Sequence, residues 1–169
     1  MNTIENILSR YSVRKFEEKH IEDEKIELLL KAGMAAPSAV NRQPWEFVVV
    51  KSEDAKKAVV DAMPFGKYNA DIIIIPCVKE IATMPLMHDL AYCDLGAASE
   101  NILLAAHELG LGAVWCAIYP NKLQIKSIKK AIKLPDGITP FSALYIGYPS
   151  SEDKGKVKDK FDTKKVRTL

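Results

Sequence analysis

The sequence has few cysteines and no long apolar run, and each absence excludes a class of protein. Its three cysteines are odd in number, far apart and form no Cys-x-x-Cys pair. We therefore expect buried thiols of a reducing cytoplasm, not disulfides or metal ligands. The chain has no run of about eighteen apolar residues, and residues 1–20 have no apolar signal-peptide core. These absences predict a protein that neither spans a membrane nor is secreted.

The charge balance is also nearly even. The 24 Lys and Arg exceed the 22 Asp and Glu by two, and the positive excess lies in residues 152–169, which carry seven basic and four acidic side chains. A nucleic-acid binder would have a larger basic patch interleaved with aromatic residues, so no nucleic-acid partner is expected. A length of 169 residues and a hydrophobic content of 48% indicate one globular domain, residues 1–169.

Familiar catalytic motifs are missing as well. The segment GLGAVW (110–115) begins like a dinucleotide-binding fingerprint, but it lacks the third glycine and leads from a helix into a strand. The segment HELGL (107–111) has Leu111 where a zinc protease has its second histidine. We find no catalytic triad, zinc site or phosphate loop. An enzyme with this sequence would take its chemistry from a bound cofactor.

The pattern of apolar residues predicts helices and strands in one chain. Helical spacing predicts helices over 2–9, 22–35, 53–62, 89–109 and 121–133. Runs rich in β-branched residues predict strands over 45–51, 71–79 and 141–148, and a further strand follows residue 110. Residues 34–44 are expected to form a loop and residues 63–70 an exposed connection.

The predicted helix 89–109 is apolar on nearly every side. A helix that is apolar all round must be buried all round, which one small domain can hardly achieve. We expect part of it, including Ala98, to pack against a second subunit, and its alanines and Gly96 would allow close approach. The alternative is the central core helix of a monomer.

Two polar segments are candidates for ligand binding. In SRYSVRKF (9–16) three cations lie within six positions beside three hydroxyl groups. This stretch is either a solvated basic turn or a phosphate site. The loop 34–44 holds hydrogen-bonding side chains between Pro37 and Pro44. It is either a rigid connection or a site for a planar heterocycle with amide edges, and the two segments together suggest flavin mononucleotide (FMN).

Four blocks of the sequence, taken in order, resemble the FMN-dependent nitroreductase family. They are SRYSVRKF (9–16), AAPSAVNRQPWEFVVV (35–50), DLGAASENILLAAHELGLGAVWCAIYP (94–120) and GYPSSEDKGKVKDKFDTKKVR (147–167). The resemblance runs over nearly the whole chain. It implies an α+β, nitroreductase-like three-layer sandwich with a mixed sheet flanked by helices. It also implies an intertwined homodimer with FMN at the subunit interface and NAD(P)H as co-substrate.

The resemblance also implies which residues bind FMN, and it assigns no side chain as a catalytic group. Arg10, Tyr11 and Ser12 would bind the phosphate and ribityl chain, and Arg14 would tune the charge at the N1/O2 edge of the flavin. Lys158 and Lys160 would complete the phosphate clamp. The strand end would offer backbone groups to N5 and O4, and a loop of the opposite subunit would contact the ring. The residues at the strand end are Cys116, Ala117 and Ile118. The residues of the opposite subunit's loop are Pro37, Ser38, Ala39, Asn41 and Gln43.

Several positions depart from the family pattern. Ala117 stands where members commonly have glycine, and Lys160 replaces an arginine, which keeps the charge but loses the bidentate fork. Either Lys67 or Asn69 is expected to face the flavin edge. Residues 80–88 are the only short candidate for a cover over the open face of the flavin.

The resemblance implies an enzyme that takes hydride from NAD(P)H and reduces a nitroaromatic, quinone or similar small acceptor by a ping-pong mechanism in the cytoplasm. One alternative is a flavin-consuming or dehalogenating relative of the same fold. Another is a flavin-binding or redox-sensing module without substantial turnover. A third is an anion-binding interaction protein that takes no flavin.

Overall fold

The structure, a computed structural model, describes residues 2–157 and 159–169. The expected helices and strands are confirmed to within two residues at each end, and the short strand β4 was not expected. In chain order the elements are α1 (Thr3–Ser9), α2 (Asp23–Met34), β1 (Trp45–Val50), α3 (Glu53–Ala62), β2 (Ile72–Lys79), α4 (Leu90–Glu108), β3 (Gly112–Ala117), α5 (Lys122–Ala131), β4 (Ile138–Pro140) and β5 (Ser142–Gly147).

The strands form one sheet in the order β1-β2-β5-β3, and β4 pairs with β2 off this path. All named strand pairs are antiparallel. Within the described residues, parallel pairing is confined to an isolated bridge between Ser12 and Ala113. The expected α+β class is confirmed. A mixed sheet was expected, and among the described residues its parallel component is only this bridge.

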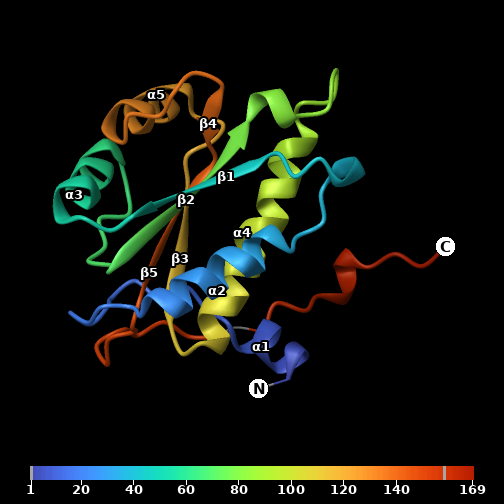
Figure 1. The fold of residues 1–169 in the computed structure, drawn as a ribbon. Coiled ribbons are helices and arrows are strands. Elements are labelled where there is room, and N and C mark those ends of the chain that lie inside the picture. The colour runs from blue at the N-terminus through green and yellow to red at the C-terminus, as the bar shows by residue number, and fades with distance from the viewer. Residues whose placement is uncertain (1, 158) are drawn as a thin grey trace.

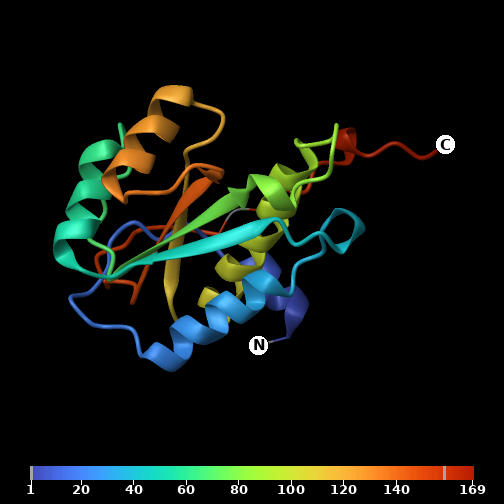
Figure 2. The same cartoon turned by 45° about the horizontal axis from the view of Figure 1, so that its top comes forward.

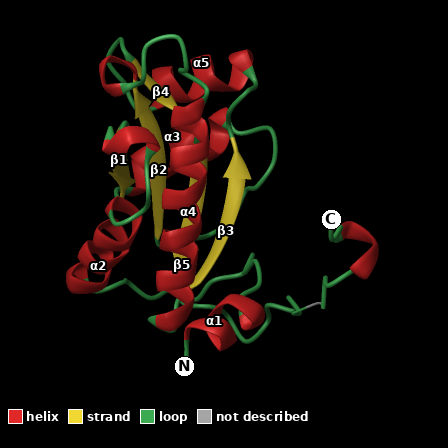
Figure 3. Ribbon diagram, turned by 90° about the vertical axis from the view of Figure 1, so that its right-hand side faces the viewer, coloured by secondary structure: helices red, strands yellow, loops and turns green. Residues whose placement is uncertain are grey.

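Helices cover both faces of the sheet, which gives three layers (Figures 1 and 2). The central strand β2 is buried on both faces because successive side chains alternate between the layers. Ile73 and Ile75 pack in the cluster that includes residues of α3 and α5, whereas Ile72 and Ile74 pack with α2 and α4. The C-terminal tail projects from the sandwich (Figure 3). No helix in the described ranges combines the length and apolar character needed to cross a bilayer.

Helix α4 is buried on one face only. Its buried residues are Ala91, Asp94, Leu95, Ala98, Ser99, Ile102, Leu103 and Ala106. A second stripe remains exposed or half-buried, and we call it the open stripe: Cys93, Gly96, Ala97, Glu100 and Leu104. The expectation that Ala98 lies between subunits is wrong, because this side chain is 0% exposed within the protomer. The open stripe is the part of α4 that a second subunit could cover.

Two paired glycines form a groove for the basic stretch 9–16. Gly112 of β3 lies opposite Gly147 of β5. A Cβ atom at Gly112 would come within 2.6 Å of Val13, and one at Gly147 within 2.9 Å of Phe16. The Val13 amide also donates to the Ala113 carbonyl at 3.0 Å. The missing side chains therefore let the basic stretch lie directly on the sheet.

Candidate functional site

The basic stretch and the C-terminal tail enclose a cavity of about 660 Å³. Four of the predicted FMN-binding residues from the stretch line it, together with Lys160 from the tail. Its lining residues are Ile7, Leu8, Arg10, Tyr11, Ser12, Arg14, Gly155, Lys156, Val157, Asp159, Lys160 and Phe161. Lys158, the other predicted clamp residue, lies outside the described residues. The structure thus brings together five predicted site residues that are up to 150 positions apart.

Arg10 is oriented by a carboxylate of α4. Its Nε donates to Oε1 of Glu100 at 3.1 Å, and the Arg10 side chain is only 21% exposed. This bond fixes the plane of the guanidinium through Nε, and the terminal nitrogens are the pair that can grip a phosphate. Burial and the charge of Arg10 together lower the pKa of the nearby His107. Glu100 was not identified from the sequence.

Asp153 anchors the tail to the basic stretch. Its Oδ2 accepts from the backbone N–H of Arg14 at 2.7 Å and of Lys15 at 3.0 Å, and its Oδ1 accepts from Gly155 at 2.8 Å. Burial acts to raise the pKa of Asp153, but these backbone hydrogen bonds outweigh it, so the pKa lies below its usual value. Gly155 then passes against Tyr11, because a Cβ there would lie 2.5 Å from the ring. Asp153 does not line the cavity itself but ties the lining residues Arg14 and Gly155 to each other.

Arg14 connects the cavity with the end of β3. Its side chain is exposed, and one terminal nitrogen donates to the Ser12 carbonyl at 3.1 Å. Burial raises the pKa of the half-buried Cys116 thiol, and the positive charge of Arg14 opposes that shift. Arg14 and Cys116 are therefore within electrostatic reach of each other, although Cys116 does not line the cavity.

Two backbone groups at the end of β3, one of Ala117 and one of Ile118, already have hydrogen-bond partners within the protomer. The Ala117 carbonyl accepts from Nε2 of Gln124 at 3.0 Å, and the Ile118 amide donates to the Phe141 carbonyl at 3.1 Å. Ala117 itself is exposed, whereas Ile118 is buried. The methyl group of Ala117, where family members commonly have glycine, therefore faces outward.

The loop from Pro37 to Gln43 does not line the cavity. Three of its residues, none of them glycine, have left-handed backbone angles: Val40 (φ 50°), Asn41 (φ 54°) and Gln43 (φ 50°). Such a residue costs on the order of 1 kcal/mol or more and persists only where its surroundings hold it. Pro37, Asn41 and Gln43 are exposed, and Ser38 and Ala39 are half-buried.

Hydrogen bonds hold this strained turn from several sides. The Gln43 amide donates to Oγ of Ser38 at 3.0 Å, and the Ala39 amide donates to Oδ1 of the buried Asp94 at 3.0 Å. Arg42 donates to the carbonyls of Ala82 and Thr83, both at 3.0 Å. The segment 80–88, the candidate cover, is thus tied to this turn.

The structure bears on whether Lys67 or Asn69 faces the flavin edge, because the Asn69 side chain is already engaged with the backbone of Phe16. Asn69 accepts from the Phe16 amide at 3.3 Å and donates to the Phe16 carbonyl at 2.9 Å. Its side chain therefore fixes the end of the basic stretch. Lys67 is exposed and stands in the connection as the cation that could face a ligand.

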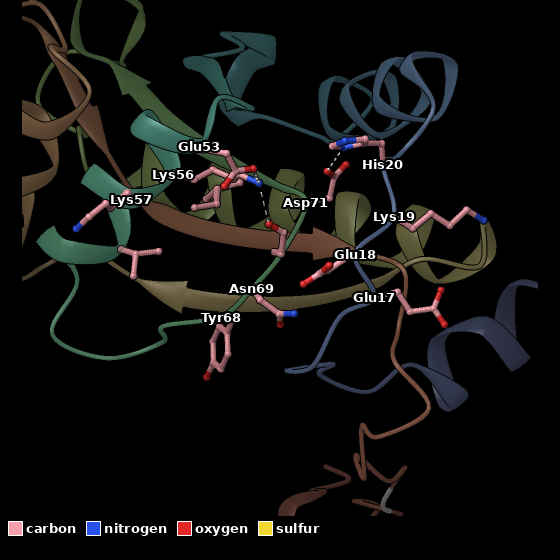
Figure 4. Close-up of a pocket in the computed structure, with 13 residues that line it drawn as sticks. Glu17, Glu18, Lys19, His20, Glu53, Lys56, Lys57, Tyr68, Asn69 and Asp71 are labelled. Atoms are coloured by element: carbon pink, nitrogen blue, oxygen red, sulfur yellow. Dashed lines mark hydrogen bonds and ion pairs between the residues drawn. The ribbon is translucent and has the colours of Figure 1, made fainter.

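A second hollow, of about 490 Å³, has a different character (Figure 4). Nδ1 of His20 lies 2.7 Å from Asp71, and Lys56 pairs with Glu53 at 2.8 Å. Charges of both signs therefore pair with one another along its wall. Of the residues that the sequence assigned to FMN, only the alternative candidate Asn69 lines it. Its four carboxylates outnumber its three lysines, which disfavours an anionic ligand there.

Comparison with known proteins identifies the family. The model of the nitroreductase family matches residues 7–64 and 64–148. The chain belongs to the nitroreductase family. The matched ranges include the basic stretch from residue 9, the loop 37–43 and the end of β3, and they stop before the C-terminal tail.

Several relatives of this nitroreductase-family chain match it over nearly full length. A protein of Archaeoglobus fulgidus named "Putative NADH dehydrogenase/NAD(P)H nitroreductase" is 38% identical over 95% of this chain and 93% of its own. A solved structure of an FMN-dependent nitroreductase from Clostridium difficile is 28% identical, with a TM-score of 0.87 and coverage of 98% of both chains. A Desulfovibrio desulfuricans protein solved in complex with FMN is also 28% identical, with a TM-score of 0.80 and coverage of 95% and 94%.

Proposed function

We propose that the protein is an FMN-dependent oxidoreductase that takes hydride from NADH or NADPH and passes the electrons to a small acceptor, such as a nitroaromatic compound or a quinone, in a ping-pong cycle. The observation that carries this proposal is the cationic cavity between the basic stretch and the tail in a nitroreductase-family chain. The names of its relatives, which include an FMN reductase that uses NADPH, support the same reaction class.

The residues of the cavity fit the cofactor. Arg10, Arg14, Lys156 and Lys160 outnumber the one acidic lining residue, Asp159. This excess of positive charge suits a phosphate dianion, and the fork of Arg10 can donate two parallel hydrogen bonds to it. Ser12 adds a hydroxyl for polar groups of the ligand. When bound, FMN supplies the hydride and electron chemistry, and the protein supplies binding, orientation and charge.

Each residue of the stretch then has its own part in binding. Arg10, held by Glu100, grips the phosphate end. Arg14 carries a fixed positive charge toward the end of β3, where it would favour the reduced, more negative cofactor over the oxidised one. Only such differential stabilisation assists the reaction, because equal stabilisation of both states would merely tighten binding.

Three features support a homodimer with shared sites. The open stripe of α4 consists largely of small side chains, which allow close helix approach. The tail projects from the sandwich (Figure 3). The loop 37–43 exposes Asn41 and Gln43 although neither lines the cavity of its own protomer. In the proposed dimer this loop serves the FMN of the partner subunit.

One experiment separates the candidate functions. Purified protein should be yellow, should bleach when NADH or NADPH is added without oxygen, and should recover its colour on addition of a nitroaromatic compound or quinone. Initial rates with both substrates varied should give the parallel double-reciprocal lines of a ping-pong cycle. Yellow protein that does not bleach would favour a flavin-binding module. Colourless protein that cannot take up FMN would refute every flavin-based reading.

A further inference from the structure

Asp94 is a carboxylate on the buried face of α4, where its neighbours along the helix are apolar. Its side chain is 8% exposed, whereas Leu95 and Ala98 beside it are 0% exposed. A charged group at such a position loses hydration, and it is retained only where a hydrogen bond compensates. That bond runs to the backbone amide of Ala39, at 3.0 Å.

Ala39, whose amide donates this hydrogen bond to Asp94, is the first residue of the strained turn of the loop. Val40 follows directly, and as a β-branched residue it is poorly suited to the left-handed angle it adopts, φ 50°. Asn41 and Gln43, the exposed polar residues of the turn, adopt the same region. Without a fixed anchor at Ala39, the turn would relax toward ordinary backbone angles and both side chains would move.

We propose that Asp94 is a positioning residue for cofactor binding: its carboxylate holds the Ala39–Gln43 turn in the left-handed conformation that presents Asn41 and Gln43 to the FMN of the partner subunit. This inference rests on the proposed function. Asp94 itself touches no cofactor. It acts by keeping the binding-competent form of the turn populated, and apparent affinity falls in proportion to that population.

The helix that carries Asp94 also carries Glu100, which orients Arg10. Two carboxylates of one rigid helix therefore fix two parts of the proposed binding machinery: Asp94 fixes the turn given to the partner, and Glu100 fixes the arginine of the protomer's own cavity. Arg42 secures the far side of the same turn through the carbonyls of Ala82 and Thr83.

The test compares Asp94→Ala with Asp94→Asn and with a matched control, Asp89→Ala. Asp89 lies at the start of the same helix, is exposed and makes no side-chain capping bond. We expect Asp94→Ala to weaken FMN binding about tenfold or more, because a charge-assisted hydrogen bond is lost. Asp94→Asn keeps an acceptor oxygen and should stay within about threefold of the wild type. Asp89→Ala should bind FMN as the wild type does.

Amide hydrogen exchange supplies a readout that needs no cofactor. In FMN-free protein, the amides of Ala39 and Gln43 should exchange faster in Asp94→Ala than in the wild type, while the amides of β2 should not change. Should Asp94→Ala fail to fold, Asp94→Leu keeps the branched arrangement of heavy atoms with two methyl groups in place of the oxygens, accepts no hydrogen bond, and carries the same two expectations.

A mixed dimer tests whether the turn acts on the partner's site. One subunit carries Asp94→Ala and the other Arg10→Ala, each with a different affinity tag. If the turn acts across the interface, both defects fall in one site and the other site binds FMN with wild-type affinity. If the turn acts within its own subunit, neither site is intact.

The outcomes are distinct. Wild-type protein that takes up no FMN would refute the proposed function itself. Wild-type protein that binds FMN, alongside an Asp94→Ala or Asp94→Leu variant with unchanged affinity or unchanged exchange at Ala39, would overturn the role of Asp94. A mixed dimer without a wild-type site would overturn its action on the partner.

Discussion

Substituting Gly112 by alanine tests whether the glycine groove is what places the basic stretch. The new Cβ would lie 2.6–2.7 Å from three side-chain atoms of Val13, closer than real Cβ contacts come. Overpacking of this kind costs roughly 1–3 kcal/mol. Replacing glycine in a strand returns about 0.5–1 kcal/mol of backbone entropy. We therefore expect Gly112→Ala to lower the free energy of unfolding by up to about 2.5 kcal/mol and to weaken FMN binding.

A double-mutant cycle isolates the contact. Val13→Ala removes two methyl groups and should cost about 1.6 kcal/mol on its own. Because it also removes Cγ1 and Cγ2, two of the three atoms that Gly112→Ala would strike, and leaves only Cβ of Val13 in the way, the double variant should be less destabilised than the sum by about 1 kcal/mol, with FMN affinity partly restored. Independent sites add to within about 0.3–0.5 kcal/mol. The pair Val13→Ala and Gly147→Ala is the matched control and should be additive, since a Cβ at Gly147 meets Phe16.

Urea unfolding of FMN-free protein at one fixed subunit concentration measures the cycle, because the proposed dimerisation would make stability concentration-dependent. FMN titration of the same four proteins measures the site. Additive free energies for Gly112→Ala and Val13→Ala would refute the groove as the determinant. Full FMN affinity in a destabilised Gly112→Ala would show that the stretch is not part of the site.

Four further predictions follow from the site. Gly96→Leu should leave the protomer folded, because nothing lies within 4 Å of a Cβ at that position. The larger side chain should prevent a second subunit from packing on the open stripe, so sedimentation that shows an intact dimer would contradict the proposed interface. Lys160→Glu should weaken binding of FMN by about one to two decades and leave riboflavin, which has no phosphate, unaffected, whereas Lys164→Glu on the same tail should change neither. Arg14→Ala should lower the reduction potential of bound FMN, with about 30 mV for each 1.4 kcal/mol, and Arg14→Lys should restore most of it; an unchanged potential in spectroelectrochemical titration would remove Arg14 from that role. Since the folded pKa of Asp153 is depressed, its stabilisation is present above its usual value of 3.8 and is lost as pH falls through the folded pKa. The stability of the wild type should therefore fall more steeply than that of Asp153→Asn as the pH is lowered below this usual value.

Much of the fold could be predicted from local patterns. The run IIIIPCV gives β2 because a central strand needs apolar side chains on both faces. Asn121 stands at the start of the expected helix 121–133, a position that asparagine favours, and its side chain accepts from the amides of Leu123 and Gln124. The basic stretch and Lys160 were assigned to one site, and they do line one cavity.

What the sequence could not provide depends on tertiary context. Helix α4 looks apolar all round, and only the packing of α2 and the sheet decides that Ala98 faces inward while Gly96 faces outward. Val40 carries no local sign of its left-handed angle, since neighbours impose that conformation. The sequence does carry a sign of the buried carboxylate: Asp94 is an acidic residue at helical spacing with the buried Ala91 and Ala98. That sign was missed.

The glycine groove also affects which part of the protein unfolds locally first. The basic stretch lies on the finished sheet and is held by a few backbone hydrogen bonds, among them Val13 to Ala113 and Glu17 to Tyr148. Segments with few such bonds open locally at a lower free energy than the core. Lifting the stretch would uncover one wall of the cavity while β2, β5 and the helices stay folded. We expect the cofactor to leave through this local opening, so its release rate should follow the stability of residues 10–16 and not the global stability of the protein.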